Sequence, residues 1–309
     1  MIIPPGFESR SLSTSLGEMV YYTQSPDGWF ASAVDAPALL FLHGFGGGSS
    51  AYEWSKVYPA FAAQYRVAAP DLIGWGQSAH PERRYTIDDY VTTITEFVEQ
   101  VGDRPSWVVA SALTAAFTIR AAIARPELFK GLILTTASGL RELDPNFQDS
   151  FFTKLIDTPV IDGVLYRTAI ANSFGIRSFL EQRQFAEPKR VYDEIVDAYL
   201  ASAQQPNGEY AALSFVRGDL SFDLTEHIGE LKTPTALIWG REAKYTGPEV
   251  GQRLIEANPE AIRVMYQLDD VGLTPQLELP AVTCGLIRRC LQQISISPPP
   301  QADPSPQSP

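Results

Sequence analysis

The chain has 309 residues, of which 45% are hydrophobic and 19% charged, so it can bury a sizeable core and is not disordered as a whole. Its 36 acidic residues outnumber 24 basic ones, which gives a formal net charge of −12. A chain this acidic, with no basic run, is not expected to bind nucleic acid or an anionic membrane as its main partner.

Apolar runs alternate with helical patterns along most of the chain. An edge strand is predicted at Glu18–Thr23, and buried strands at Ala38–Leu42, Tyr65–Ala69, Trp107–Ala110, Gly131–Thr136, Thr235–Trp239 and Ile262–Gln267. Helices are predicted at Ile87–Val101, Leu113–Ala124, Pro248–Asn258 and Pro280–Gln293. Repeated strand–helix units of this length specify an α/β fold, a mostly parallel sheet with helices on both faces.

Residues 141–223 interrupt this alternation. They are rich in aromatic side chains at mostly helical spacing and contain no strand of the same kind. We predict a helical cap over the C-terminal edge of the sheet, inserted between two parts of the core, residues 1–140 and 224–296. Most of the aromatics would form the core of the cap itself, but a cap that borders a cleft also supplies part of its apolar wall.

The two ends of the chain carry no sign of export or of a membrane anchor. Residues 1–6 lack the basic and apolar regions of a signal peptide, and no run of about 18 apolar residues occurs. Cys284 and Cys290 are expected to be reduced core residues. We therefore predict a cytoplasmic protein without a transmembrane segment, and a disordered Pro-rich tail at residues 297–309.

Two glycine-containing loops follow buried strands, at His43–Gly47 and at Asp71–Ser78. With the helix-to-strand step Pro126–Leu134 and the strand Pro234–Gly240, they resemble the α/β-hydrolase superfamily in order and spacing, from about residue 8 to residue 293. The resemblance implies the α/β-hydrolase fold, with the cap inserted after the sixth strand of the family fold. The cap is also similar in texture to those of cyanobacterial and plant relatives that include chlorophyll dephytylases and pheophytinases.

The resemblance further implies where a catalytic triad would lie. In this superfamily the nucleophile occupies a strained strand–turn–helix between small residues, and an acid and a histidine follow it in the chain. In this chain Ala112 holds the nucleophile position, Ala243 the acid position and Leu273 the histidine position. Loss of all three is more simply explained by natural divergence than by one inactivating substitution, so we expect no triad-based hydrolysis.

A displaced catalytic set is the alternative. Ser111 with Glu242 or Asp269 could hydrolyse a hydrophobic ester of the lipid or chlorophyll type without a histidine. In the frame of Ser111, however, Val109 and Leu113 would fill the positions that need small residues. Haloalkane dehalogenation would need a carboxylate at position 112, which is an alanine.

The chain has three histidines, and each has a structural interpretation. His43 is expected to pack and form hydrogen bonds under the glycine loop, His80 to be solvated near the surface, and His227 to lie on a helix. A general base must come within about 3 Å of the proton that it takes. None of the three occupies such a position in the resemblance.

The backbone half of the site is expected to remain. The resemblance implies an oxyanion hole formed by the N–H groups of Phe45, between Gly44 and Gly46, and of Leu113. Backbone donors do not depend on side chains, and with the helix dipole they would attract a carbonyl oxygen or a carboxylate. We therefore expect a non-hydrolytic binder of an apolar small molecule with a carbonyl or carboxylate group, or of a protein partner.

A purely structural or assembly role, with a vestigial cleft, is a third hypothesis. No cofactor or metal is expected, because the chain has no His, Cys and Asp cluster with metal-ligand spacing. The glycine-rich run Gly46–Ser50 lacks the Lys and Ser/Thr of a phosphate loop.

Overall fold

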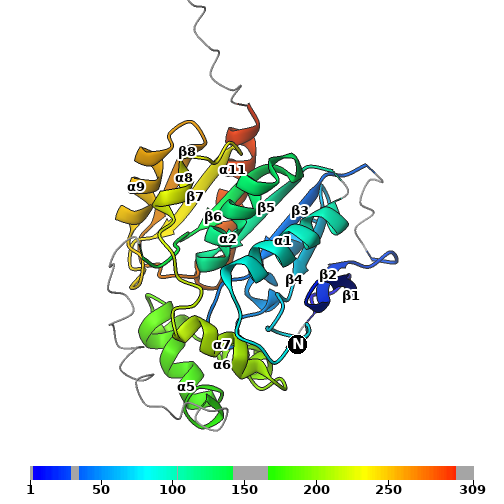
Figure 1. The fold of residues 1–309 in the computed structure, drawn as a ribbon, viewed down its shortest axis with the longest axis vertical. Coiled ribbons are helices and arrows are strands. Elements are labelled where there is room, and N and C mark those ends of the chain that lie inside the picture. Colours follow the sequence, from blue (N-terminus) through cyan, green and yellow to red (C-terminus); the bar gives the residue numbers. More distant parts are fainter. Residues whose placement is uncertain (1–2, 29–34, 103, 142–165, 297–309) are drawn as a thin grey trace, which may run out of the picture.

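An eight-stranded sheet forms the centre of the molecule (Figure 1). The computed structural model describes residues 3–28, 35–102, 104–141 and 166–296. The strands lie in the order β1-β2-β4-β3-β5-β6-β7-β8, and β3 to β8 are parallel. Their bounds are β1 Phe7–Thr14, β2 Gly17–Gln24, β3 Ala38–Leu42, β4 Arg66–Pro70, β5 Ser106–Ser111, β6 Phe129–Thr135, β7 Thr235–Gly240 and β8 Ile262–Leu268.

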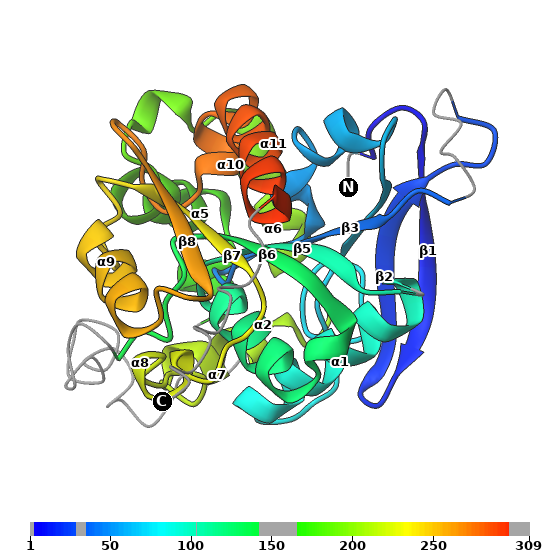
Figure 2. The ribbon, with the colours of Figure 1, turned by 90° about the horizontal axis from the view of Figure 1, so that it is seen from above.

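Helices cover both faces of the sheet, as the continuous apolar strands require (Figure 2). Alternate side chains of β3 go to different layers. Leu40 belongs to the hydrophobic cluster that includes α1 (Ile87–Gly102), α2 (Ala112–Ala124) and α9 (Pro248–Ala257), and Phe41 belongs to the cluster that includes α11 (Pro280–Ile296). Cys284 and Cys290 are free and buried in the second layer. No helix among the described residues is long and apolar enough to cross a membrane.

The predicted edge strand is not at the edge. Residues 18–23 belong to β2, which pairs with β1 on one side and with β4 on the other, both antiparallel. The prediction missed β1 because its sequence, FESRSLST, is mostly polar and exposes most of its side chains. A strand that packs on one face only does not need a continuous apolar run.

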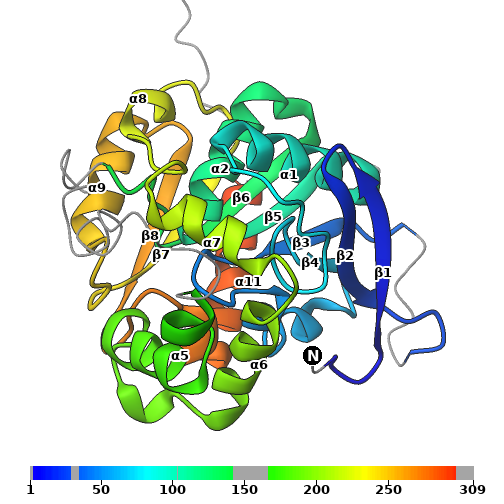
Figure 3. The ribbon, with the colours of Figure 1, turned by 60° about the horizontal axis from the view of Figure 1, so that its bottom comes forward.

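The segment between β6 and β7 is helical where the structure describes it. We call residues 166–222 the helical insertion; its main elements are η5 (Tyr166–Ile170), α5 (Ser173–Phe179), η6 (Leu180–Gln184), α6 (Asp193–Ala203) and α7 (Gly208–Val216). It lies across one end of the sheet (Figures 1 and 3). The aromatics expected in the cap at Phe147, Phe151 and Phe152, and the tail 297–309, lie outside the described residues.

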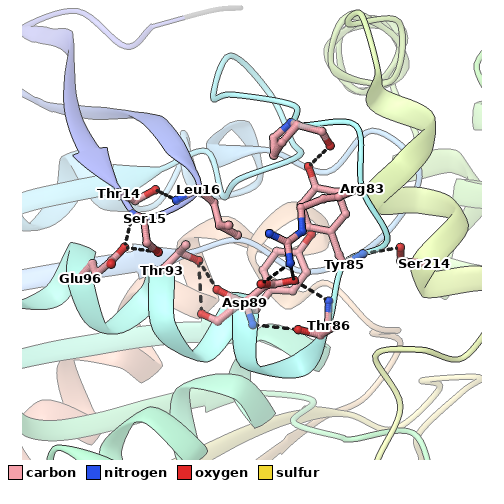
Figure 4. Close-up of polar contacts among 12 residues, drawn as sticks. Thr14, Ser15, Leu16, Arg83, Tyr85, Thr86, Asp89, Thr93, Glu96 and Ser214 are labelled. Carbon is pink, nitrogen blue, oxygen red and sulfur yellow. Dashed lines mark hydrogen bonds and ion pairs between the residues drawn. The ribbon is translucent and has the colours of Figure 1, made fainter.

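Polar contacts at the start of α1 tie the core to the helical insertion (Figure 4). Thr86 Oγ1 accepts from the Asp89 N–H at 3.2 Å, and Asp89 Oδ2 accepts from the Thr86 N–H at 2.9 Å, a reciprocal cap of the helix. Arg83 pairs with the Asp89 carboxylate at 2.9 Å. The Tyr85 N–H donates to Ser214 Oγ of α7 at 2.9 Å, so the insertion is attached at the point where α1 begins.

Candidate functional site

A sharp turn joins β5 to α2 at the centre of the sheet. Ser111 ends β5, where it pairs with Thr135 of β6, and Ala112 begins α2. The φ angle of Ala112 is 53°, in the left-handed region that favours glycine. The residue expected at the nucleophile position therefore has the strained backbone that such a turn imposes.

A small cavity of about 50 Å³ lies at this turn. Its wall includes Ala112, Leu113, Phe45 and Leu273 from the core, and Phe179 and Phe215 from the helical insertion. A single water needs roughly 10–15 Å³ of such space and benzene about 150 Å³, so this cavity accommodates a small group. Among the described residues that line it, none is Lys, Arg or His.

A second cavity of about 120 Å³ adjoins the first. Gly46 and Gly47 line it from the core, and Ile170 and Ile176 from the helical insertion. Phe179 and Phe215 line both cavities, so these two rings form a shared wall.

The structure brings together some of the predicted residues and not others. Gly44, Phe45, Leu113, Ala112 and Leu273 line the first cavity, and Gly46 lines the second. Among the described residues, the N–H groups of Phe45 and Leu113 donate no hydrogen bond. Hydrogen bonds to the backbone of Leu273 hold its loop in place. The Leu273 N–H donates to Gln184 O at 2.8 Å, and the Leu273 carbonyl accepts from Thr136 Oγ1 at 2.8 Å.

The acid candidates do not reach the cavity. Ala243 is buried but is not on the cavity wall. Glu242 is exposed, and its carboxylate accepts from the Val271 N–H at 3.0 Å. The Asp269 side chain is 83% exposed and pairs with Arg241 at 2.7 Å. The structure therefore does not bring Ser111 together with Glu242 or Asp269, as the displaced catalytic set would require.

The histidines lie away from the cavity wall. His43 is fully buried; its Nδ1 donates to Gly44 O at 2.8 Å and its Nε2 accepts from the Leu72 N–H at 3.0 Å, so the expected structural role is confirmed. Burial lowers the pKa of His43 to about 4, which keeps the ring neutral. His227 lies on α8 (Thr225–Ile228), as predicted. The prediction that His80 is solvated is wrong, because His80 is half-buried and its Nε2 has no hydrogen-bond partner in the described structure.

A buried carboxylate on the cavity wall was missed by the sequence analysis. Glu53 lies on η1 (Ala51–Trp54), just after the glycine loop, and is 1% exposed. Its carboxylate accepts from the Gly44 N–H at 2.9 Å, from the Tyr199 hydroxyl at 3.0 Å and from Gln276 Nε2 at 3.4 Å. Burial raises the pKa of Glu53, and these hydrogen bonds act in the opposite direction.

Glu53 is part of a hydrogen-bond network that joins distant segments. Gln184 Nε2 donates to the Tyr199 hydroxyl at 2.7 Å, so the hydroxyl hydrogen is free to point at Glu53. Gln276 Nε2 also donates to Ser111 Oγ at 3.3 Å. No local signal marks Glu53 as buried, since in sequence it is one acidic residue in a short, partly polar loop.

Glu53, Ser111 and Ala112 lie close to Gly44 and line the same cavity. A Cβ atom built on Gly44 would lie 3.3 Å from Glu53 Oε2, 3.6 Å from Ser111 Oγ and 3.7 Å from the Ala112 methyl. The oxygen atoms next to position 112 are thus a buried carboxylate and a hydroxyl. In the described part of the chain, no group of three His, Cys, Asp or Glu side chains could hold a metal ion.

Comparisons with known sequences point to one family. Residues 37–270 match the family described as the alpha/beta hydrolase fold. The chain is 29% identical over 195 residues to a haloalkane dehalogenase of Bradyrhizobium diazoefficiens, and the match covers 60% of this chain and 61% of that protein. It is 27% identical to the uncharacterized hydrolase YugF of Bacillus subtilis, over 77% of this chain and 84% of that protein.

Solved structures share the architecture over most of the chain. Cfl2 from Burkholderia cenocepacia matches with a TM-score of 0.73 and 22% identity, over 92% of this chain and 95% of that one. A serine hydrolase involved in carbazole degradation matches with a TM-score of 0.72 and 19% identity, over 93% and 99%. At these identities the likeness shows the fold alone.

Proposed function

Given that this chain belongs to the alpha/beta hydrolase fold family, we propose that it binds a small, mainly apolar molecule between its core and its helical insertion without hydrolysing it. One observation carries the proposal. The strained β5–α2 turn, where the family places its nucleophile, holds Ala112 on the cavity wall. A methyl group has no electron pair with which to attack a substrate.

The other two triad positions support the same function. Leu273 lines the cavity where a histidine would act as general base, and Ala243 is buried without reaching the wall. The N–H groups of Phe45 and Leu113 still supply backbone donors, which an oxyanion hole would use. In this proposal the helical insertion acts as a cap that provides the aromatic side of the binding site.

The known relatives do not alter this conclusion. A dehalogenase of this family would need a carboxylate nucleophile at position 112, and the chain has alanine there. Ser111 remains a hydroxyl on the cavity wall, but its Oγ accepts a hydrogen bond from Gln276 Nε2, and no histidine is among the described residues that line the wall. An ester assay on wild type and Ser111→Ala distinguishes hydrolysis by Ser111 from binding without hydrolysis.

An ester assay tests the absence of hydrolysis. Wild type and Ser111→Ala would be compared on p-nitrophenyl acetate and p-nitrophenyl palmitate, together with labelling by a fluorophosphonate probe. We expect the same background rate from both proteins and no labelling. Turnover by wild type clearly above that of Ser111→Ala would replace the binding function with a displaced hydrolase.

Restoration of the triad tests the assignment of the three positions. Ala112→Ser, Ala243→Asp and Leu273→His together should hydrolyse p-nitrophenyl acetate at least about 10²-fold faster than Ala112→Ser alone, the low end of what a positioned acid–base residue provides. Ala112→Ser alone should stay at background, since it gains a nucleophile but no base. A triple variant that folds and binds ester without turnover would contradict the assignment.

A further inference from the structure

Glu53 is a buried acid without a cationic partner. It is 1% exposed and lines the 50 Å³ cavity. In the described part of the chain it forms no salt bridge, and no lining residue of the cavity is basic. A buried carboxylate is stable only when hydrogen bonds or an opposite charge compensate its lost hydration.

The hydrogen bonds around Glu53 favour its ionised form. The Gly44 N–H can only donate, and the Tyr199 hydroxyl accepts from Gln184, so it donates its own hydrogen to Glu53. Donors to both carboxylate oxygens stabilise the anion more than the neutral acid. Gln276 Oε1, in the same cluster, is buried and receives no hydrogen bond from the described residues.

The N-terminus of α2 and the Glu53 carboxylate bring charges of opposite sign to the cavity wall. The N-terminus of α2 carries the equivalent of about half a positive charge. Ionised Glu53 carries a full negative charge on the same wall, and it already uses the Gly44 N–H of the glycine loop. Burial raises the pKa of Glu53, but wherever the carboxyl is ionised its full charge exceeds the half charge of the helix terminus, and a carboxylate ligand would be repelled.

We propose that this cavity binds a small primary alkylammonium ion, with the ammonium group beside Glu53. The proposal rests on the binding function proposed above. An ammonium group has three donors, and Glu53 and Ser111 supply acceptor oxygens on the cavity wall. The short alkyl chain would contact Leu113 and Leu273, and the rings of Phe179 and Phe215 complete a wall that suits a cation.

Three probes of similar size but different charge test the proposal. Dissociation constants of methylammonium, methanol and formate, which suit a cavity of about 50 Å³, would be measured for the wild-type chain by ligand-observed NMR at pH 7.5. We expect methylammonium to bind at least about ten-fold more tightly than formate, with methanol between them, since one buried charge pair separates the probes. Equal or tighter binding of formate would overturn the ammonium proposal.

Two variants test whether the preference for the ammonium probe depends on Glu53. Glu53→Gln keeps the shape of the side chain and removes its charge, so it should abolish the difference between methylammonium and formate. Glu256→Gln, an exposed residue of α9, removes the same charge from the surface and should keep the difference. A difference that persists in folded Glu53→Gln would overturn the proposal, and if this variant does not fold, the wild-type order of the three probes decides.

The outcomes separate this proposal from the one on which it rests. Binding of methanol without a preference for methylammonium overturns the ammonium proposal and leaves the proposed binding function in place. Failure of all three probes to bind overturns the ammonium proposal, and the ester assay then reports separately on the absence of hydrolysis.

Discussion

At the scale of single residues, three of the five described non-glycine residues with positive φ lie at or next to the cavity. Ala112 and Thr136 follow the carboxyl ends of β5 and β6 with φ angles of 53° and 46°, and Leu140, on the cavity wall, has φ 78°. Non-glycine residues in this region persist only where the surroundings impose them, and they cluster at functional sites. Thr136 also holds the Leu273 carbonyl through its hydroxyl. The turn thus keeps its strained geometry although the side chain at 112 is a methyl.

Ala112→Gly should stabilise the protein. Glycine adopts φ near 53° without the clash that an L side chain suffers, so the free energy of unfolding should rise by about 1 kcal/mol. Ala116→Gly, in the interior of the same helix, should instead lower it by about 1 kcal/mol or more. Urea denaturation would measure both variants. A loss of stability in Ala112→Gly equal to that of Ala116→Gly would show that position 112 is not strained.

At the scale of elements, α10 (Pro275–Glu278) joins the loop after β8 to the helical insertion. The buried carboxylate of Glu278 accepts from the Gly272 N–H at 2.7 Å and from the Ala186 N–H at 2.8 Å, and Arg190 lies 3.7 Å away. Burial raises the pKa of Glu278 to about 7. One side chain therefore fixes the loop that carries Leu273 against the helical insertion.

The pH dependence of stability should show this carboxyl. Because the folded-state pKa lies above the ordinary value of 4.5, the stabilising contribution is fully present below about pH 4.5 and is lost as pH rises through 7. Relative to Glu278→Gln, the free energy of unfolding of wild type should fall by up to about 3 kcal/mol between pH 4.5 and 8. Urea denaturation of both proteins across this range measures this difference. The other buried acids contribute equally to the two proteins, so their effect cancels. A difference in the free energy of unfolding that does not change with pH would contradict the raised pKa of Glu278.

At the scale of the whole molecule, residues of the core and of the helical insertion line the cavity together. The glycine loop after β3 contacts α6 closely: a Cβ on Gly48, whose φ is 97°, would lie 2.2 Å from Tyr199 O. Next to it, Ser49 O accepts from Ser202 Oγ at 3.0 Å. Tyr199 reaches from the same helix to Glu53. The position of the helical insertion therefore depends on the absence of a side chain at 48.

Gly48→Ala should disrupt the contact between the glycine loop of the core and α6 of the helical insertion. The new methyl meets a backbone carbonyl and its own φ is unfavourable, so we expect a loss of at least about 2 kcal/mol in the free energy of unfolding. Gly285→Ala, on an exposed helical position of α11 with nothing within 4 Å of a Cβ, should gain about 1 kcal/mol. Denaturation midpoints in urea measure both, and an unchanged midpoint in Gly48→Ala would contradict the close contact.

Much of the fold could be predicted from local sequence. The strands β3 to β8 and the helices α1, α2, α9 and α11 lie where apolar runs and helical periodicity place them, because a buried strand needs an apolar run whatever its neighbours are. The resemblance in the loops and turns correctly implied the family. The expected cytoplasmic location and the division of the chain at residues 141 and 223 stay predictions.

The sequence by itself, through its resemblance to the superfamily, assigned Ala112, Ala243 and Leu273 to the three triad positions, and this assignment stays a prediction. Ala112 lies on the strained turn and Leu273 on the cavity wall, whereas Ala243 does not reach that wall. Only the tertiary structure decided what surrounds that turn. The donors that hold Glu53 include Tyr199 and Gln276, which are 146 and 223 residues away in sequence. The burial of Glu53 depends on groups that come together only when the sheet, the loops and the helical insertion pack. A local sequence pattern therefore cannot predict it.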